Sequence, residues 1–298
     1  MESRCNDTPI NILVSYAYCG NDKKLTELMV NMSRRGSANF MLDSGAFTKF
    51  NVTSAFKHVN LKDYIAYCHD YGKEFEKYVM LDIVGNEEQS RKNYETMINS
   101  GLSPMFVVTM FDKDMDYVRQ TLEINPNICV AGGVTTKSDW MTKRFQDIYK
   151  ACNGKCRMHG LGYVTFPKML QLNLASVDSS SWGAAPARFG KITYFNNGLK
   201  QNSQKDYISG RKKVPKQVID ALEFCGITPS MFKKPENNRG RACIGLMLSI
   251  LANTQLQQYC YRRGLRFFLA ASKLLDLIQI QYISENINNL RYEDFKKL

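Results

Sequence analysis

The sequence of 298 residues lacks the features of membrane and secreted proteins. No apolar run approaches the ~20 residues of a membrane-spanning helix, and the longest, residues 242–252, is typical of a buried helix. The N-terminal residues lack the apolar segment of a secretory signal peptide. The 9 cysteines are scattered, without the spacing of a disulfide scaffold. We therefore expect a reduced, cytoplasmic location and no membrane partner.

Acidic residues are scarce relative to basic ones. The chain has 28 Asp plus Glu against 40 Lys plus Arg, a formal net charge of +12. Hydrophobic residues make up 44%, which provides a sizeable core and excludes wholesale disorder. The positive excess favours a polyanionic partner, most often nucleic acid, over a basic surface kept only for solubility.

Short apolar, β-branched runs alternate with stretches of helical spacing, which predicts βαβ units and a parallel sheet. The predicted strands are 10–16, 39–42, 78–81, 105–109, 128–131, 156–159, 174–177 and 192–195. The predicted helices between them include 23–34, 61–71, 87–99, 114–123 and 138–151. Eight strands predict an α/β fold of the (β/α)8 TIM-like barrel type, irregular at its last two crossovers. An open, doubly wound sheet is the alternative.

The pattern changes after the predicted eighth strand. Residues 196–216 are polar, basic and rich in turn formers, which indicates a linker or a mobile surface loop. From residue 215 onward helical patterns dominate, and no strand is expected. We therefore expect a catalytic barrel over 1–198 and, over 199–298, a basic linker and helices packed on the barrel. The apolar stretches 244–252 and 267–280 would dock these helices, or else form a homodimer interface.

Polar and small residues follow the predicted strands, where a barrel builds its active site. They are Asp43-Ser44-Gly45 after the second strand, Asp82 after the third, Thr109 at the end of the fourth, Gly132-Gly133 after the fifth, His159-Gly160-Leu161-Gly162 after the sixth and Asp178 after the seventh. A single Asp in such a place often only caps a helix. Three of them on one rim suit glycosidic chemistry, in which one carboxylate attacks an anomeric carbon and another moves protons.

The same residues carry a family resemblance. LDSGAFT at 42–48 resembles the DSGGFQ signature of the tRNA-guanine transglycosylases. Later landmarks follow in the family's order, at MLDI around Asp82, AGGV at 131–134, HGLGY at 159–163 and VDSSSW at 177–182. That family's C-terminal zinc element has no counterpart after Cys225, and Thr109 or Met110 stands where it reads the base with Gln. A compact chain without the zinc element is similar to the bacteriophage DpdA-type 7-deazaguanine DNA transglycosylases.

The resemblance implies an enzyme that replaces guanine in DNA by a free 7-deazaguanine base, such as 7-cyano-7-deazaguanine, and so protects phage DNA from restriction. Asp178 would be the nucleophile, Asp43 the general base, and Asp82 would read the Watson–Crick edge. Phe47 and His159 would enclose the ring. The other implied base-binding residues are Ser44, Gly45, Thr109, Gly132, Gly133, Gly160, Leu161 and Gly162. The implied reaction needs neither cofactor nor metal.

The nucleic-acid contacts follow from the same hypothesis. A guanine must be flipped out or single-stranded to reach the rim, and Lys and Arg would hold the phosphates. Arg188 is expected near the pocket mouth, and Trp182 either stacks on a neighbouring base or is a buried structural residue. The basic candidates on the predicted linker are Lys200, Arg211, Lys212 and Lys213.

Other functions remain open from the sequence. A tRNA-guanine transglycosylase would share the chemistry, although the zinc element is missing. A non-catalytic nucleic-acid-binding relative would have no need of the paired Asp43 and Asp178. Cys152, Cys156 and His159 also superficially resemble metal ligands, but a fourth ligand is not evident.

Overall fold

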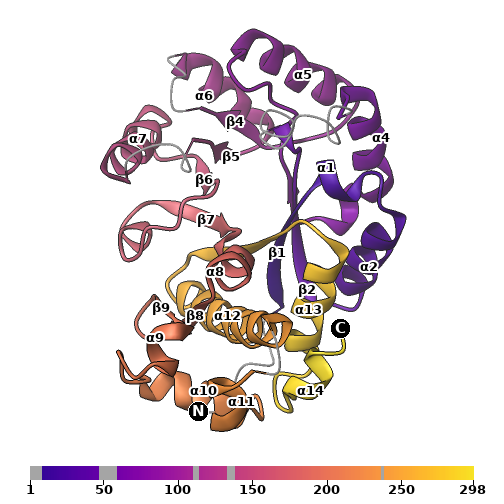
Figure 1. Cartoon of the computed structure of the whole chain (residues 1–298). Helices are drawn as coiled ribbons and strands as arrows, with labels where there is room; N and C mark the ends of the chain where they lie inside the picture. Colours follow the sequence, from indigo (N-terminus) through magenta and orange to yellow (C-terminus); the bar gives the residue numbers. More distant parts are fainter. Residues whose placement is uncertain (1–8, 47–58, 110–113, 133–137, 236–237) are drawn as a thin grey trace.

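The computed structural model describes residues 9–46, 59–109, 114–132, 138–235 and 238–298. Its centre is a curled, eight-stranded parallel sheet in the order β3-β2-β1-β10-β7-β6-β5-β4, with helices on its outer face (Figure 1). The strands are β1 (Ile10–Ser15), β2 (Ala38–Asp43), β3 (Lys77–Tyr78), β4 (Phe106–Val108), β5 (Asn127–Val130), β6 (Arg157–Gly160), β7 (Leu174–Ser179) and β10 (Arg266–Ala271). The prediction of an α/β fold is confirmed at this level.

The helices of the first βα units begin where their capping residues allow. These helices are α2 (Lys23–Arg34), α4 (Leu61–Tyr71), α5 (Glu87–Asn99), α6 (Met115–Ile124) and α7 (Ser138–Ala151). Asp22, Asn60, Asn86 and Asp114 each accept a hydrogen bond from a backbone N–H of the first turn of α2, α4, α5 and α6. Such caps satisfy N–H groups that a helix start leaves without partners. The five predicted helices are therefore confirmed, with ends shifted by no more than a residue.

The two ends of the strand order approach each other. Val79, directly after β3, forms an isolated parallel bridge with Met105, directly before β4. The Met105 N–H donates to Tyr78 O at 2.8 Å, and the Met80 N–H donates to Met105 O at 3.0 Å. The curled sheet is therefore compatible with a TIM-like barrel.

The eighth strand of the sheet was assigned to the wrong segment by the sequence analysis. β10 pairs in parallel with β1 on one side and with β7 on the other. The predicted eighth strand is instead β8 (Lys191–Phe195), which forms an antiparallel two-stranded sheet with β9 (Leu199–Ser203). The expectation that residues 267–280 are helical is wrong for its first part, because Phe267, Phe268 and Leu269 lie in β10.

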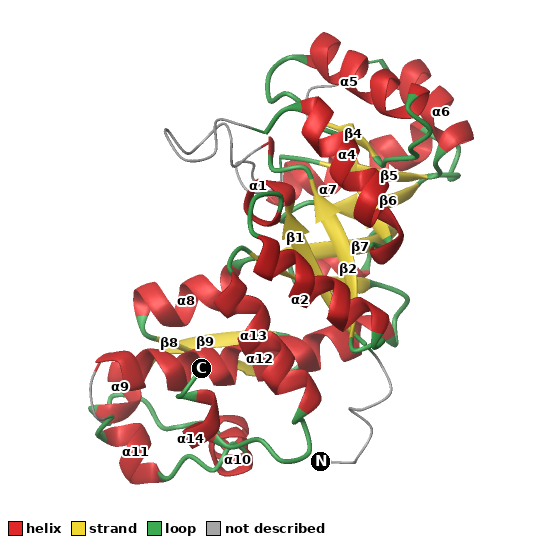
Figure 2. Cartoon of the chain, turned by 90° about the vertical axis from the view of Figure 1, so that its right-hand side faces the viewer, coloured by secondary structure: helices red, strands yellow, loops and turns green. Residues whose placement is uncertain are grey.

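The segment between β7 and β10 forms a second lobe beside the sheet (Figure 2). It contains the β8–β9 hairpin and α8 (Ser181–Phe189), α9 (Gln204–Ile208), α10 (Lys216–Phe224), α11 (Pro229–Lys233) and α12 (Asn238–Tyr261). About half of the predicted linker 196–216 is thus β9 and α9. A boundary at residue 198 does not separate sheet from appendage, because α12 packs against α8, β8 and β10 and leads back into the sheet.

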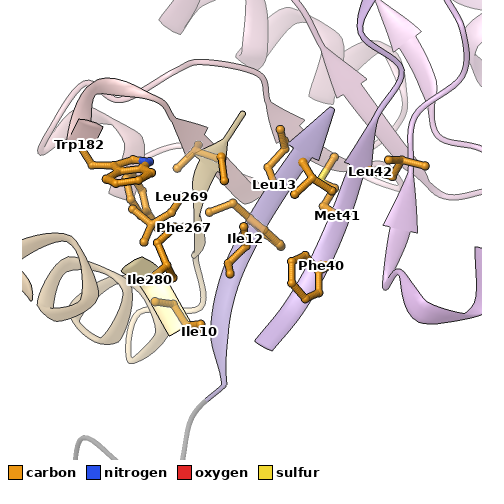
Figure 3. Close-up of a cluster of buried hydrophobic side chains, with 14 of the residues drawn as sticks. Ile10, Ile12, Leu13, Phe40, Met41, Leu42, Trp182, Phe267, Leu269 and Ile280 are labelled. Carbon is orange, nitrogen blue, oxygen red and sulfur yellow. The ribbon is translucent and has the colours of Figure 1, made fainter. Parts of the chain in front are cut away.

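The core lies between the sheet and these helices. Ile12, Phe40, Phe267 and Leu269 are almost completely buried on neighbouring strands, and Ile280 of α13 (Leu274–Glu285) covers them (Figure 3). A parallel sheet covered on both faces requires such continuous apolar strands. The predicted buried helix over 242–252 is confirmed as the middle of α12. Within the described parts of the chain, no helix has the length and apolarity to cross a membrane.

Candidate active site

The carboxyl ends of the strands bring the predicted site residues together. Asp43 is the last residue of β2, Asp178 lies near the end of β7, and His159 lies near the end of β6. Parallel strands end at one edge of the sheet, so residues distant in sequence meet there. The predicted gathering of polar groups at this rim is therefore seen for its described members.

A tight turn after β2 fixes the Asp43 carboxylate. The Gly45 N–H donates to Asp43 Oδ2 at 3.0 Å. Gly45 has φ +86°, and a Cβ there would lie 2.5 Å from the Ala17 Cβ and 2.9 Å from the Ser15 Oγ. Only glycine fits both this backbone conformation and this space. Gly45 thus shapes the turn that holds Asp43.

The electrostatic environment of Asp43 favours its protonated form. The pKa of Asp43 is raised to about 6, mainly by burial and also by the negative charge of Asp178, while the Gly45 hydrogen bond lowers it. Smaller opposing effects come from Ser15 and His159. A carboxyl group whose pKa lies near neutrality can both accept and return a proton. Asp43 therefore has the properties of a general acid–base group.

Asp178 is held by two donors. The Gly162 N–H donates to its Oδ1 at 2.7 Å, and His159 Nε2 lies 3.2 Å from the same oxygen. His159 Nδ1 lies 2.8 Å from Ser176 Oγ, so the imidazole ring bridges Ser176 and Asp178. Within the described chain these hydrogen bonds fall on Oδ1, which leaves Oδ2 of Asp178 to face a reacting atom.

A third carboxylate, Asp82, stands beside this pair. Ser44 Oγ donates to Asp82 Oδ1 at 3.4 Å, and the Ala46 N–H donates to Ser44 Oγ at 3.4 Å. Cys129 of β5 is fully buried beneath the rim. Burial raises its pKa well above the usual value, and the charges of Asp43, Asp178 and Asp82 each add to that shift. The Cys129 thiol is therefore close to all three carboxylates, which lie around a common centre.

The two catalytic candidates have different surroundings. Asp178 is oriented by an N–H group and an imidazole, whereas Asp43 is buried against a glycine turn with a raised pKa. Pairs of carboxyl groups whose environments differ in this way commonly divide the work of nucleophile and proton carrier. The arrangement can thus support displacement at an anomeric carbon.

The other predicted base-binding residues lie at the ends of β4 to β6. Thr109 follows β4 and accepts a hydrogen bond from Arg144 on its backbone oxygen, Gly132 follows β5, and Leu161 follows β6; all three are half-buried. Gly160 is buried, and a Cβ there would lie 3.1 Å from Phe145 and 3.2 Å from Tyr163. Close packing is thus the visible reason for glycine at 160. Phe47 and Gly133 lie outside the described residues.

Two aromatic predictions need correction. His159 is 1% exposed, and its ring nitrogens face Ser176 and Asp178, so its edge positions a carboxylate instead of its face covering a base. Trp182 is 2% exposed, and its indole N–H donates to the Ala270 oxygen at 2.9 Å (Figure 3). The stacking role for Trp182 is therefore wrong, and the buried structural alternative is confirmed.

The basic candidates lie on the second lobe. Arg188 is exposed in the last turn of α8, about two turns of helix beyond Asp178. Lys200 is exposed on β9. Arg211 pairs with Asp206 at 2.9 Å, Lys212 donates to Asn202 at 2.8 Å, and Lys213 is exposed beside them. The partners of Arg211 and Lys212 belong to the same lobe, so the structure does not bring these two side chains to the rim carboxylates.

The metal-site alternative finds no support in the geometry. Both ring nitrogens of His159 are directed at Ser176 and Asp178, away from Cys152 and Cys156. Over the described ranges, no group of three or more His, Cys, Asp or Glu side chains is arranged to hold a metal ion.

Sequence reasoning missed four residues of the site. Ser15 ends β1 opposite Asp43, Ser176 bonds to His159, Cys129 underlies the carboxylates, and Phe268 lies edge-on to His159 with ring centroids 6.1 Å apart. The two-residue period of a strand could have indicated Ser176, two positions before Asp178. Phe268 could not be found without recognising β10.

No protein-family model matches the chain, and no curated protein matches it either.

Proposed function

We propose that this chain is a DNA base-exchange enzyme, which replaces guanine by a 7-deazaguanine derivative through a covalent bond between Asp178 and the sugar. The observation that carries the proposal is the pairing of Asp178, oriented by Gly162 and His159, with Asp43, whose pKa burial raises to about 6. The ordered sequence resemblance around these residues supplies the substrate class.

In the first displacement, Asp178 Oδ2 attacks C1′ of the deoxyguanosine. The C1′–N9 bond breaks, its electron pair stays on guanine N9, and the departing guanine takes a proton from water, while Asp43 loses its own proton to the solvent. Gly162 and His159 hold Oδ1 meanwhile, so the carboxylate keeps its orientation. The result is an ester between Asp178 and the sugar.

In the second displacement, the incoming base replaces guanine. Asp43, now ionised, takes the proton from N9 of the 7-deazaguanine, and N9 attacks C1′. The C1′–O bond breaks and Asp178 regains its carboxylate. Two displacements at one carbon retain the β configuration. Asp82, with Ser44 beside it, accepts hydrogen bonds from the N1–H and 2-amino groups of each base.

The proposal includes a closed (β/α)8 barrel, a cytoplasmic location and a role in protecting phage DNA from restriction. Closure is supported by the hydrogen bonds between the Met105 strand and the Tyr78 strand. DNA as the polymer is supported by the net charge of +12 and by the absence from the sequence of the zinc element that marks the tRNA enzymes.

Base exchange itself is the decisive experiment. The purified protein is incubated with labelled 7-cyano-7-deazaguanine and with duplex DNA, single-stranded DNA or tRNA, and label retained in polymer is counted. We expect label in DNA, and a loss of about 10⁴-fold or more in Asp178→Asn. Asp220→Asn is the matched control, because Asp220 lies on α10 in the second lobe and pairs with Lys216.

Each other outcome points elsewhere. Label only in tRNA would assign the chain to the tRNA-guanine transglycosylases. Binding of polymer without label in any of them would favour a non-catalytic relative. Full exchange activity in Asp178→Asn would show that another group is the nucleophile.

A further inference from the structure

Three basic residues lie on the inner face of the curled sheet, near the amino ends of its strands. Lys77 pairs with Met41 in the β2–β3 register, and Met41 lies two residues before Asp43 on β2. Residues two apart on a strand point to the same face, so Lys77 shares the inner face with Asp43. Arg157 lies two positions before His159, and Arg266 is opposite Ser176, whose hydroxyl meets His159 inside. Three strands therefore place a positive residue at the end opposite the carboxylates, where Lys77 and Arg266 are half-buried and Arg157 is exposed.

The charges of this cluster do not balance. Arg266 forms an ion pair with Glu76, although two strands, β1 and β2, lie between β10 and β3 in the sheet order. Lys77 Nζ lies 3.6 Å from the same carboxylate. Glu76 thus faces Arg266 and Lys77, and Arg157 adds a third cation. Three positive charges meet one negative charge.

Lys77 and Arg157 lie close enough to repel each other. Burial lowers the pKa of Lys77, and the positive charge of Arg157 lowers it further. Among the residues that the structure describes, no ion pair or side-chain hydrogen bond of Arg157 is present. The side chain of Lys77 is only 21% exposed, so water screens this repulsion incompletely.

Amide side chains complete the inner surface at this level. Asn39 Nδ2 donates to Asn11 Oδ1 at 3.2 Å, and Asn127 lies at the start of β5 opposite Arg157. These groups are polar and uncharged, so they do not offset the excess positive charge.

We propose that Lys77, Arg157 and Arg266 form an anion site for a phosphate group at the amino end of the sheet. Guanidinium groups donate paired hydrogen bonds to phosphate oxygens, and a dianion would match the two uncompensated charges. The phosphate belongs either to free inorganic phosphate or to a nucleic-acid backbone. The site is at the opposite end from Asp178, so it stands or falls independently of base exchange.

Phosphate binding is measured by thermal unfolding and titration calorimetry, in sodium phosphate and in sodium chloride of equal ionic strength. Near saturation, phosphate should raise the unfolding midpoint by about 3 °C or more beyond chloride. In Arg157→Gln this difference should vanish and phosphate affinity should fall at least about tenfold. Arg263→Gln is the matched control, because its guanidinium lies over the Tyr259 ring, 3.6 Å from the centroid, and bonds to the Tyr259 oxygen.

A second variant guards against misfolding as an explanation. Glu76→Gln removes the competing carboxylate, so phosphate affinity should rise by several-fold, a gain that a damaged fold would not give. Equal midpoints in phosphate and chloride, or an unchanged phosphate effect in Arg157→Gln, would overturn the proposal.

The source of the phosphate is decided by oligonucleotide binding at fixed salt. Fluorescence anisotropy of a labelled oligonucleotide is compared between the unmodified chain and Arg157→Gln. Weaker binding in the variant, together with the lost phosphate effect, assigns the site to a nucleic-acid backbone. Unchanged oligonucleotide binding with a lost phosphate effect assigns it to free phosphate.

Discussion

The two ends of the same sheet carry opposite chemistry. The carboxyl end carries the acidic residues Asp43, Asp82 and Asp178. The amino end carries the basic residues Lys77, Arg157 and Arg266. β6, for example, contributes Arg157 to one end and His159 to the other, only two residues apart. Every second residue of a strand faces the inside of the curled sheet, so two inward-facing residues that follow each other on a strand lie at successive levels of the interior.

An apolar layer keeps the two ends apart. Leu13 and Met41 lie on the inner face between Asn11 and Asn39 below and Ser15 and Asp43 above, and both are buried. This layer separates the carboxylates from the cations at the other end, so the two sets of charges do not form ion pairs with each other. Burial and the charge of Asp178 consequently shift the pKa of Asp43 more than any distant positive charge does.

The largest expected effect is on the second displacement. Asp43→Asn removes the group that takes the N9 proton, so base incorporation should fall by about 10²–10⁴-fold. The covalent adduct between protein and DNA should still form and should accumulate, because Asp178 is intact. Denaturing gel electrophoresis detects the adduct, and label in DNA reports incorporation. If Asp43→Asn lost both the adduct and incorporation, Asp43 would be needed for the first displacement as well as for the second.

The same variant tests how much the ionised Asp43 lowers the free energy of unfolding. An unfolded Asp has a pKa of about 3.9, and folding raises that of Asp43 to about 6, so the folded state binds the proton more tightly. The stabilisation from this proton is fully present below about pH 4 and is lost as the pH rises through about 6. Asp43→Asn should therefore be more stable than the unmodified chain by about 2 kcal/mol at pH 7, and the gap should close towards pH 4. Urea unfolding at several pH values measures it, and a gap independent of pH would contradict the assigned burial.

A smaller effect is expected from the residue that positions the nucleophile. His159→Gln weakens the hold on Asp178 Oδ1, and kcat should fall by about 10–100-fold, by analogy with residues that orient metal ligands, with little change in KM. Ser176→Ala should show the same pattern at a smaller size, because Ser176 acts only through the His159 ring. Steady-state kinetics of base exchange separates kcat from KM. A rise in KM alone would indicate that His159 contacts the base after all.

The smallest effect concerns Trp182 in the second lobe. Trp182→Phe removes the hydrogen bond to the Ala270 oxygen and should lower the free energy of unfolding by about 1–2 kcal/mol. Affinity for DNA should stay within about twofold, since the buried indole cannot stack on a base. Urea unfolding and anisotropy titration measure the two quantities. The exposed Trp140 provides a matched Trp→Phe control, for which no comparable loss of stability is expected.

The sequence predicted the first seven strands of the sheet but not the eighth. Each of the first seven is a short apolar run, followed in five cases by a predicted helix. The apolar run determines the strand because both faces of the sheet are buried. ITYF at 192–195 satisfies the same rule equally well, yet it pairs with β9. FFLAA at 267–271 reads as part of a helix because apolar residues follow it into α13. Local pattern does not distinguish these segments, since only pairing with β1 and β7 selects β10.

What the sequence determined by itself is the order of the units and the placement of polar residues at strand ends, including Asp43, Asp82 and Asp178. These follow from local periodicity and from the rule that strand ends of a parallel sheet share one edge. Tertiary structure alone decided that His159 turns its edge to Asp178, that Trp182 is buried, and that Lys77, Arg157 and Arg266 lie at the same end of the sheet. The physical reason is that burial and charge neighbours arise from strands far apart in the chain, which no window of sequence contains.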